Sequence, residues 1–185
     1  MKATEILMEE HRVIERVLTA LEKTAKAAGS VQEIRPGFFL NAADFIKGFA
    51  DGCHHRKEEG VLFKEIVAAG IPEHGGPVGV MLAEHEQGRV FTRGMRQAAE
   101  RWQAGDLSAR DSVVQNALGY VSLLRNHIYK EDNILFPLAD RIIPKDKQDS
   151  LTLAFDQVEH EETGEGVHEK YLGLAEQLVE EAAGY

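Results

Sequence analysis

Two stretches of the chain carry the same unusual pattern, and this repeat constrains the fold more than any other feature of the sequence. Residues 54–63 and 127–136 align without a gap, and both read His-x-x-Lys-Glu-acid-x-(Val/Ile)-Leu-Phe. Residues four apart share one face of an α-helix, so the histidine and glutamate of each copy point the same way. The Leu-Phe pair that follows favours burial. We therefore expect two helices that each turn an imidazole and a carboxylate toward the interior.

Apolar residues recur at helical spacing around both copies and along most of the chain. Glycine- and proline-containing segments such as Gly29-Ser30 and Gly70-Ile71-Pro72 interrupt the pattern. The spacing predicts helices over residues 4–28, 38–69, 78–103 and 108–141, and a further helical stretch over residues 145–183.

Each of the four longer predicted helices breaks its apolar stripe with a histidine, and two of them add a glutamate one turn later. A charged carboxylate inside a helix bundle costs several kcal/mol unless it is paired or binds a metal. Coincidental polar residues in the core are the competing interpretation, which is disfavoured because buried unpaired polar groups are rare. The predicted metal ligands are His11, His54, Glu58, His85, His127 and Glu131.

The repeat extends beyond the ten residues. Glu10-His11 resembles Glu84-His85, and each pair precedes its own copy by a similar distance. We therefore predict that the first two helices form one helical hairpin and that the next two form a second hairpin. Two hairpins packed face to face give an all-α, antiparallel up-down four-helix bundle with pseudo-two-fold symmetry. We expect one domain over residues 1–185, with the bundle at about 4–141 and an additional C-terminal helix at about 145–183.

The donor set indicates which metals suit this site. Imidazole and carboxylate without thiolate suit iron or manganese, with zinc as an alternative. Two glutamates from opposite sides of a bundle can each bridge two ions, typically about 3.5–4 Å apart. The single cysteine, Cys53, excludes an internal disulfide or a multi-cysteine cluster and is expected to be a small buried residue.

Composition narrows the class of protein. The 185 residues are 43% hydrophobic, enough for a sizeable core, and carry a net charge of -10, which disfavours nucleic acid and anionic membranes as partners. No apolar run approaches the roughly 20 residues of a membrane span. The N-terminal residues lead into an acidic helical pattern without a signal-peptide core. We expect a cytoplasmic protein; the sequence does not specify its oligomeric state.

At these residues the chain resembles the hemerythrin-like (HHE cation-binding) family. The resemblance covers about residues 4–141 through His11, His54-x-x-x-Glu58, His85 and His127-x-x-x-Glu131. It implies a non-haem centre of two iron ions, oxo- or hydroxo-bridged, inside a four-helix bundle. Members of the family carry oxygen, sense oxygen or iron, or take part in defence against nitric oxide and peroxide and in iron-centre repair.

The chain departs from the oxygen-carrying hemerythrins on the third helix. Those proteins have a His-x-x-x-His pair there, whereas the residue four after His85 is Arg89. The resemblance therefore implies one histidine fewer, which counts against simple reversible oxygen carriage.

The first copy allows a second register, because His55 and Glu59 are also four residues apart. In the second copy, His127 and Asp132 form the five-residue step of hemerythrins proper. Aligning the copies on Leu-Phe favours His54 and Glu58. We therefore expect His55 and Glu59 to be flanking groups, either supporting a ligand from outside or facing solvent.

The tail contains candidates for additional ligands. Continuing its apolar stripe leads past Glu162, Glu165 and His168 (or Glu169). If this helix covers the bundle beside the metals, Glu162 or His168 is a candidate to fill an open iron position. The alternative is a solvated acidic helix kinked at Gly164 and Gly166, which the pattern favours for the glutamates and leaves evenly balanced for His168.

Three functional hypotheses follow. The leading one is that the protein binds or senses dioxygen, a related diatomic molecule or iron itself, without turnover. The second is a di-iron oxidoreductase that acts on peroxide or nitric oxide at open iron positions. The third is a metal-free helical interaction module, which elemental analysis would distinguish.

Overall fold

The structure, a computed structural model, describes residues 2–30, 33–164 and 166–185, and only the backbone of residues 161–163. Every regular element in this part of the chain is a helix. The first and third long helices are α1 (Ala3–Ala28) and α5 (Pro77–Gln103). The second is a continuous helical run through α2 (Gly37–Phe45), η1 (Ile46–His54), α3 (His55–Lys57), η2 (Glu58–Leu62) and α4 (Phe63–Ala68).

The fourth long helix and the tail are also built from several pieces. The fourth begins with the 3₁₀ turn η3 (Leu107–Ala109) and continues through α6 (Arg110–Lys130), η4 (Glu131–Leu135) and α7 (Phe136–Ile142). The tail consists of the 3₁₀ turn η5 (Lys145–Lys147), α8 (Gln148–Gln157), η6 (Val158–Thr163) and α9 (Val167–Ala183).

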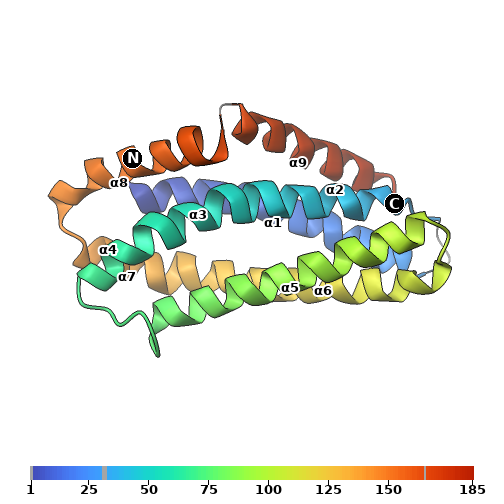
Figure 1. Cartoon of the computed structure of the whole chain (residues 1–185), viewed down its shortest axis with the longest axis horizontal. Coiled ribbons are helices and arrows are strands. Elements are labelled where there is room, and N and C mark those ends of the chain that lie inside the picture. The colour runs from blue at the N-terminus through green and yellow to red at the C-terminus, as the bar shows by residue number, and fades with distance from the viewer. Residues whose placement is uncertain (1, 31–32, 165) are drawn as a thin grey trace.

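The four long helices form the predicted bundle (Figure 1). α5 packs along α6, α1 packs along α6, and α2 packs along α5. α8 and α9 cross one side of the bundle, where α9 contacts α1 and α2. The all-α four-helix prediction with a helical C-terminal addition is confirmed.

The apolar interior consists of two clusters separated along the bundle axis. One cluster includes Leu18, Phe39 and Leu124, and the other includes Leu7, Phe63 and Phe136. Along α1, Glu10 and His11 lie between Leu7 of one cluster and Ile14 of the other. The stripe of each bundle helix is therefore broken at the same depth, where a polar layer divides the core.

The helices that carry the repeat are not regular α-helices at that depth. π-helical segments begin at Glu58 and at Glu131, and a longer one ends at His54. A π-helical turn holds an extra residue and is frequently found at functional sites. The hydrophobic period alone predicted uninterrupted α-helices, so these segments are a difference between the prediction and the structure.

The tail is helical as predicted but divided into two parts. Gly164 and Gly166 have φ angles of 105° and 76°, which residues with a side chain rarely adopt. α9 then packs so closely that a Cβ placed on Gly48 would lie 1.8 Å from a ring carbon of Tyr171. A glycine at position 48 therefore permits the docking of α9 on η1.

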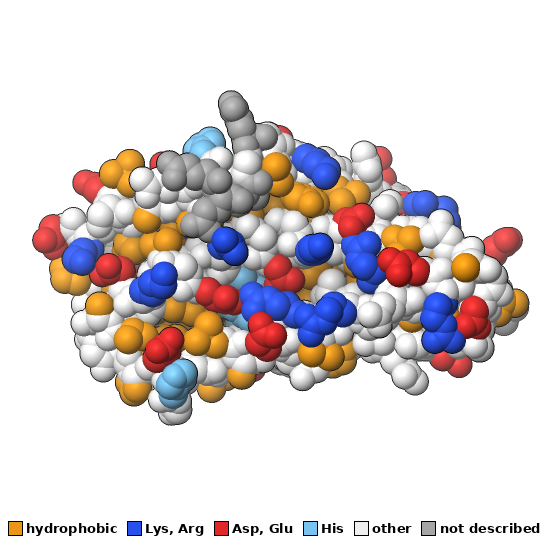
Figure 2. Space-filling model, viewed as in Figure 1, with side chains coloured by type: hydrophobic (Ala, Val, Ile, Leu, Met, Phe, Trp, Pro, Cys, Tyr) orange, Lys and Arg blue, Asp and Glu red, His pale blue; other side chains and the backbone are white. Residues whose placement is uncertain are grey.

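The surface carries charged side chains of both signs, with hydrophobic side chains between them (Figure 2). Along the described parts of the chain, none of the helices combines the length and apolar character needed to cross a bilayer.

Candidate metal centre

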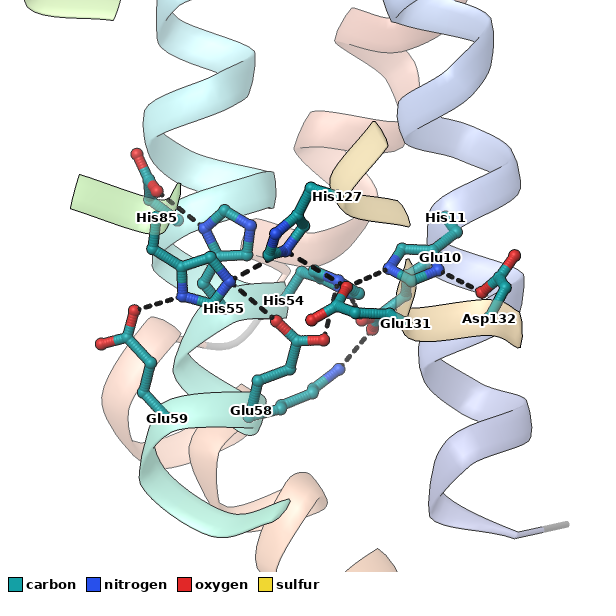
Figure 3. Close-up of polar contacts among 12 residues, drawn as sticks. Glu10, His11, His54, His55, Glu58, Glu59, His85, His127, Glu131 and Asp132 are labelled. Atoms are coloured by element: carbon teal, nitrogen blue, oxygen red, sulfur yellow. Dashed lines mark hydrogen bonds and ion pairs between the residues drawn. The ribbon is translucent and has the colours of Figure 1, made fainter. Parts of the chain in front are cut away.

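The polar layer brings five histidines and two glutamates together inside the bundle (Figure 3). Each of these side chains is at most 3% exposed. The histidines form two groups, which we call the two-histidine group (His11 and His54) and the three-histidine group (His55, His85 and His127). All six ligands predicted from the sequence lie in this layer, and the seventh member is His55.

The two glutamates lie between the histidine groups. Each carboxylate approaches the Nε2 atom of one histidine from each group, which is the arrangement that a bridging ligand needs. Glu58 lies 3.4 Å from both His54 and His85, while Glu131 lies 3.3 Å from His11 and 3.2 Å from His127.

Every imidazole in the layer is held from its outer side by a carboxylate. In each case the Nδ1–H donates to a carboxylate oxygen at 2.7–2.9 Å. A carboxylate at Nδ1 fixes the ring orientation and leaves the Nε2 lone pair for a metal, as is usual for metal-binding histidines. The pairs are His11 with Asp132, His54 with Glu10, His55 with Asp51, His85 with Glu59 and His127 with Glu84.

These contacts explain the rest of the repeated pattern. Lys57 donates to Glu10 Oε1 at 2.5 Å, and the equivalent Lys130 donates to Glu84. Each lysine thus neutralises the carboxylate that holds a histidine of its own copy. The acidic residue after the central glutamate supports a histidine of the other hairpin. The repeated lysine and acidic residue were visible in the sequence. However, helical periodicity indicates only which face of a helix a residue lies on, not which residue on another helix it contacts.

His55 corrects the prediction for the first copy. It is 3% exposed, so the solvent-facing alternative is wrong, and it belongs to the three-histidine group with a ligand atom close to Glu58. Its counterpart in the second copy is Ile128, so this histidine makes the two halves of the layer unequal. Glu59 is a flanking group as expected, because it accepts from His85 Nδ1.

In the metal-free layer, the buried carboxylates of Glu58 and Glu131 lack enough positive charge beside them. Burial and the charge of Glu131 raise the pKa of Glu58 well above its usual range. Burial lowers the pKa of His11, but the hydrogen bond to Asp132 and the nearby charge of Glu131 outweigh it and raise that pKa to about 9. Burial also lowers the pKa of His127, but the charge of Glu131 outweighs this effect and raises that pKa to about 9. Without a metal ion, protons therefore take the place of cations beside the two carboxylates.

The residues fit a pair of metal ions. All four oxygens of Glu58 and Glu131, and Nε2 of His11, are buried without a hydrogen-bond partner among the described residues. The Nε2 atoms of His85 and His127 lie 3.1 Å apart although both rings donate from Nδ1 to carboxylates. Two imidazole lone pairs facing each other in a core would be unfavourable, so a proton or a metal ion must lie beside these two nitrogens.

Comparison with known families agrees with this geometry. The profile of the family described as "Hemerythrin HHE cation binding domain" matches residues 2–139, about three-quarters of the chain. The chain belongs to this family. The resemblance inferred from the sequence is thereby confirmed.

Relatives of this HHE domain include an uncharacterized protein of Mycobacterium bovis and uncharacterized proteins of two Mycobacterium tuberculosis strains. Each is 26% identical over 163 residues, covering 88% of this chain and 63% of the relative. The chain thus spans less than two-thirds of the length of these relatives. No solved structure matches the chain significantly.

The tail of the HHE domain does not bring His168 to the histidine–glutamate layer. Its Nδ1 lies 3.8 Å from Cys53 Sγ and 3.4 Å from Glu159, in a separate group beside the layer. Cys53 is buried as expected, and burial raises the pKa of its thiol to about 12. The side chain of Glu162 lies outside the described residues, as does Glu165.

Arg89, at the position where oxygen-carrying hemerythrins have a histidine, has a supporting position in this HHE domain. Its guanidinium donates to Glu59 at 2.7 Å and lies 3.5 Å from Asp51. These are the carboxylates that hold His85 and His55. The third helix has one histidine fewer, as expected, but His55 adds a fifth histidine to the buried layer.

Proposed function

We propose that this HHE domain holds two iron ions and binds a small external ligand, such as dioxygen or a related diatomic molecule, without turnover. The observation that carries the proposal is the position of each glutamate between a histidine of one group and a histidine of the other. Iron is the metal that we propose for this nitrogen and oxygen donor set, with manganese or zinc as alternatives.

Counting donors favours an open position on one ion. If each glutamate gives one oxygen to each ion, the two-histidine group supplies four protein donors and the three-histidine group supplies five. Six-coordinate iron therefore has more room for an external ligand at the two-histidine group. Bound iron would supply an electron-rich centre for such a ligand, while the glutamates bridge and the outer carboxylates fix the imidazoles.

The proton arrangement favours binding over turnover. Peroxide chemistry needs protons delivered to the ligand, and each imidazole in the layer donates its Nδ1–H outward to a carboxylate. No imidazole N–H of these five rings is therefore directed toward the ligand side once metals are held by Nε2.

Elemental analysis and near-ultraviolet spectroscopy test the proposal. Protein expressed with added iron should contain two irons per chain and show the charge-transfer bands of a bridged di-iron centre. Glu58→Ala and Glu131→Ala should each abolish the bands. Glu65→Ala serves as the matched control, because Glu65 lies outside the layer and pairs with Lys147. Unchanged metal content in both glutamate variants would refute the assignment.

Stopped-flow addition of peroxide to the iron-loaded protein separates a binder from an enzyme. A single stable spectral change supports the proposal. Repeated peroxide consumption with oxygen release would instead establish the oxidoreductase hypothesis. Metal-free protein after expression with iron, manganese or zinc would leave the interaction-module hypothesis.

A further inference from the structure

A groove lies on one side of the bundle, directly outside the three-histidine group. Two adjoining cavities of about 490 and 640 Å³ form it, and both are lined by Asp51, Arg56, Glu59 and Arg89. The volumes fall in the range of small-molecule sites, roughly 300–1,000 Å³. Its walls come from the helical run η1, α3, η2 and α4 and from α5, with α8 and the start of η6 contributing at one end.

The lining of this groove is strongly basic although the chain has a net charge of -10. Among the described residues, its acidic lining residues are Asp51 and Glu59. Both of these already accept hydrogen bonds from histidines of the metal layer. Figure 2 shows several basic side chains across the middle of this face, with acidic side chains among them. The basic lining residues are Lys47, Arg56, Lys64, Arg89, Arg93 and Arg96.

Nearby acids among the described residues compensate only part of this charge, and Arg56 also has an interaction partner. Arg96 pairs with Asp44, and Arg89 contacts Glu86 in addition to Glu59. Lys47 and Arg93 are exposed at the rim, and neither forms an ion pair with the described side chains. Clefts lined by one sign of charge focus the field and concentrate ions of the opposite sign.

The related face of the second hairpin provides an internal comparison. A cavity of about 490 Å³ lies beside Asp132, which is the counterpart of Glu59. Its charged lining residues are Arg12, Glu15, Arg125 and Asp132, so it is electrically balanced. The positive charge of the groove is therefore not a by-product of the repeat.

We propose that this groove binds a small anion carrying two or more negative charges, such as a phosphate-bearing or polycarboxylate compound. Arginine forks match the planar oxygen pairs of these groups, and Lys47 adds a point charge at the rim. A bound anion would be separated from His55 and His85 only by the carboxylates that hold them. The site depends on neither the metal identity nor the ligand proposed above.

Calorimetric titration of the metal-loaded protein with inorganic pyrophosphate, at low ionic strength, tests this proposal. We expect saturable binding of one pyrophosphate per chain and much weaker binding of acetate. Lys47→Glu and Arg93→Glu should each weaken pyrophosphate binding by about tenfold, the effect of losing one charge-assisted contact. Both side chains are exposed, so the folded structure should persist, which circular dichroism verifies.

Arg125→Glu is the matched control, because it makes the same charge change in the balanced cavity. Its pyrophosphate affinity should stay within about twofold of wild type. Equal weakening in Arg125→Glu would show that only net charge matters and would overturn the proposal. Unchanged pyrophosphate binding in both groove variants would also overturn the proposal. That result is expected if pyrophosphate binds at the metal ions or extracts them.

Discussion

At the scale of single residues, equivalent positions of the repeat share a role but differ in environment. Lys57 and Lys130 both donate to the carboxylate that supports a histidine of their own copy. The Lys57 side chain is 1% exposed and also bonds Glu159, whereas Lys130 is 31% exposed. Removing one partner of a buried ion pair is far more costly than removing one at the surface.

We predict that Lys57→Met destabilises the protein by about 3–5 kcal/mol, because it leaves the Glu10 carboxylate buried without its cation. Lys130→Met should cost about 1 kcal/mol or less. Urea unfolding of the two metal-free variants measures both values. Equal losses would show that burial does not distinguish the two lysines.

His55 is the residue that makes the centre asymmetric, and its counterpart Ile128 suggests the substitution to test it. We predict that His55→Ile weakens the binding of one of the two metal ions, because the three-histidine group falls from five protein donors to four. His74→Ala, in the exposed loop before α5, should keep both metals. Two tightly bound metals in His55→Ile would remove His55 from the ligand set.

The sequence predicted six of the seven buried polar residues of the centre because each breaks an apolar stripe. It misplaced His55, since aligning the copies on Leu-Phe assumes one ligand per helical turn. His54 ends one π-helical segment and Glu58 begins another, so His54 and His55 both reach the layer. The outer partners Glu10, Glu84 and Asp132 could not be assigned, because each supports a histidine on a different helix.

At the scale of elements, the bundle follows from periodicity, but the π-helical segments and the break in the tail do not. A π-helical turn changes the register by one residue, which the hydrophobic pattern does not resolve. Gly164 and Gly166 indicated an irregularity in the tail helix. The sequence predicted a kink there, whereas the structure has a complete break between η6 and α9. Docking of α9 instead depends on the close approach of Tyr171 to Gly48, a contact between residues far apart in the sequence.

We predict that Gly48→Ala destabilises the protein by about 1–3 kcal/mol, because the new methyl group would overlap Tyr171. In a Tyr171→Ala background the same substitution should cost much less. Chemical unfolding of the four proteins of this double-mutant cycle gives the coupling. An unchanged cost in the Tyr171→Ala background would mean that α9 does not dock as described.

At the scale of the whole molecule, the polar layer lies between the two apolar clusters, so its charge state influences global stability. The pKa values of His11 and His127 are raised from 6.5 to about 9 without metal. A raised pKa gives stability that is full below 6.5 and lost as the pH rises through about 9. The metal-free protein should therefore become less stable over this window.

Metal loading must displace the same protons, so it should release protons at pH 7, and apparent affinity should rise up to about pH 9. Calorimetry in buffers of different ionisation enthalpy measures the released protons. A metal affinity that is independent of pH between 6.5 and 9 would contradict this charge balance.

Anomalous diffraction at the iron absorption edge, from crystals of iron-loaded protein, tests the central claim most directly. We expect two peaks per chain, about 3.5–4 Å apart. Glu58 and Glu131 should bridge them, with His11 and His54 at one peak and His55, His85 and His127 at the other. A single peak, no peak, or peaks outside this layer would contradict the account.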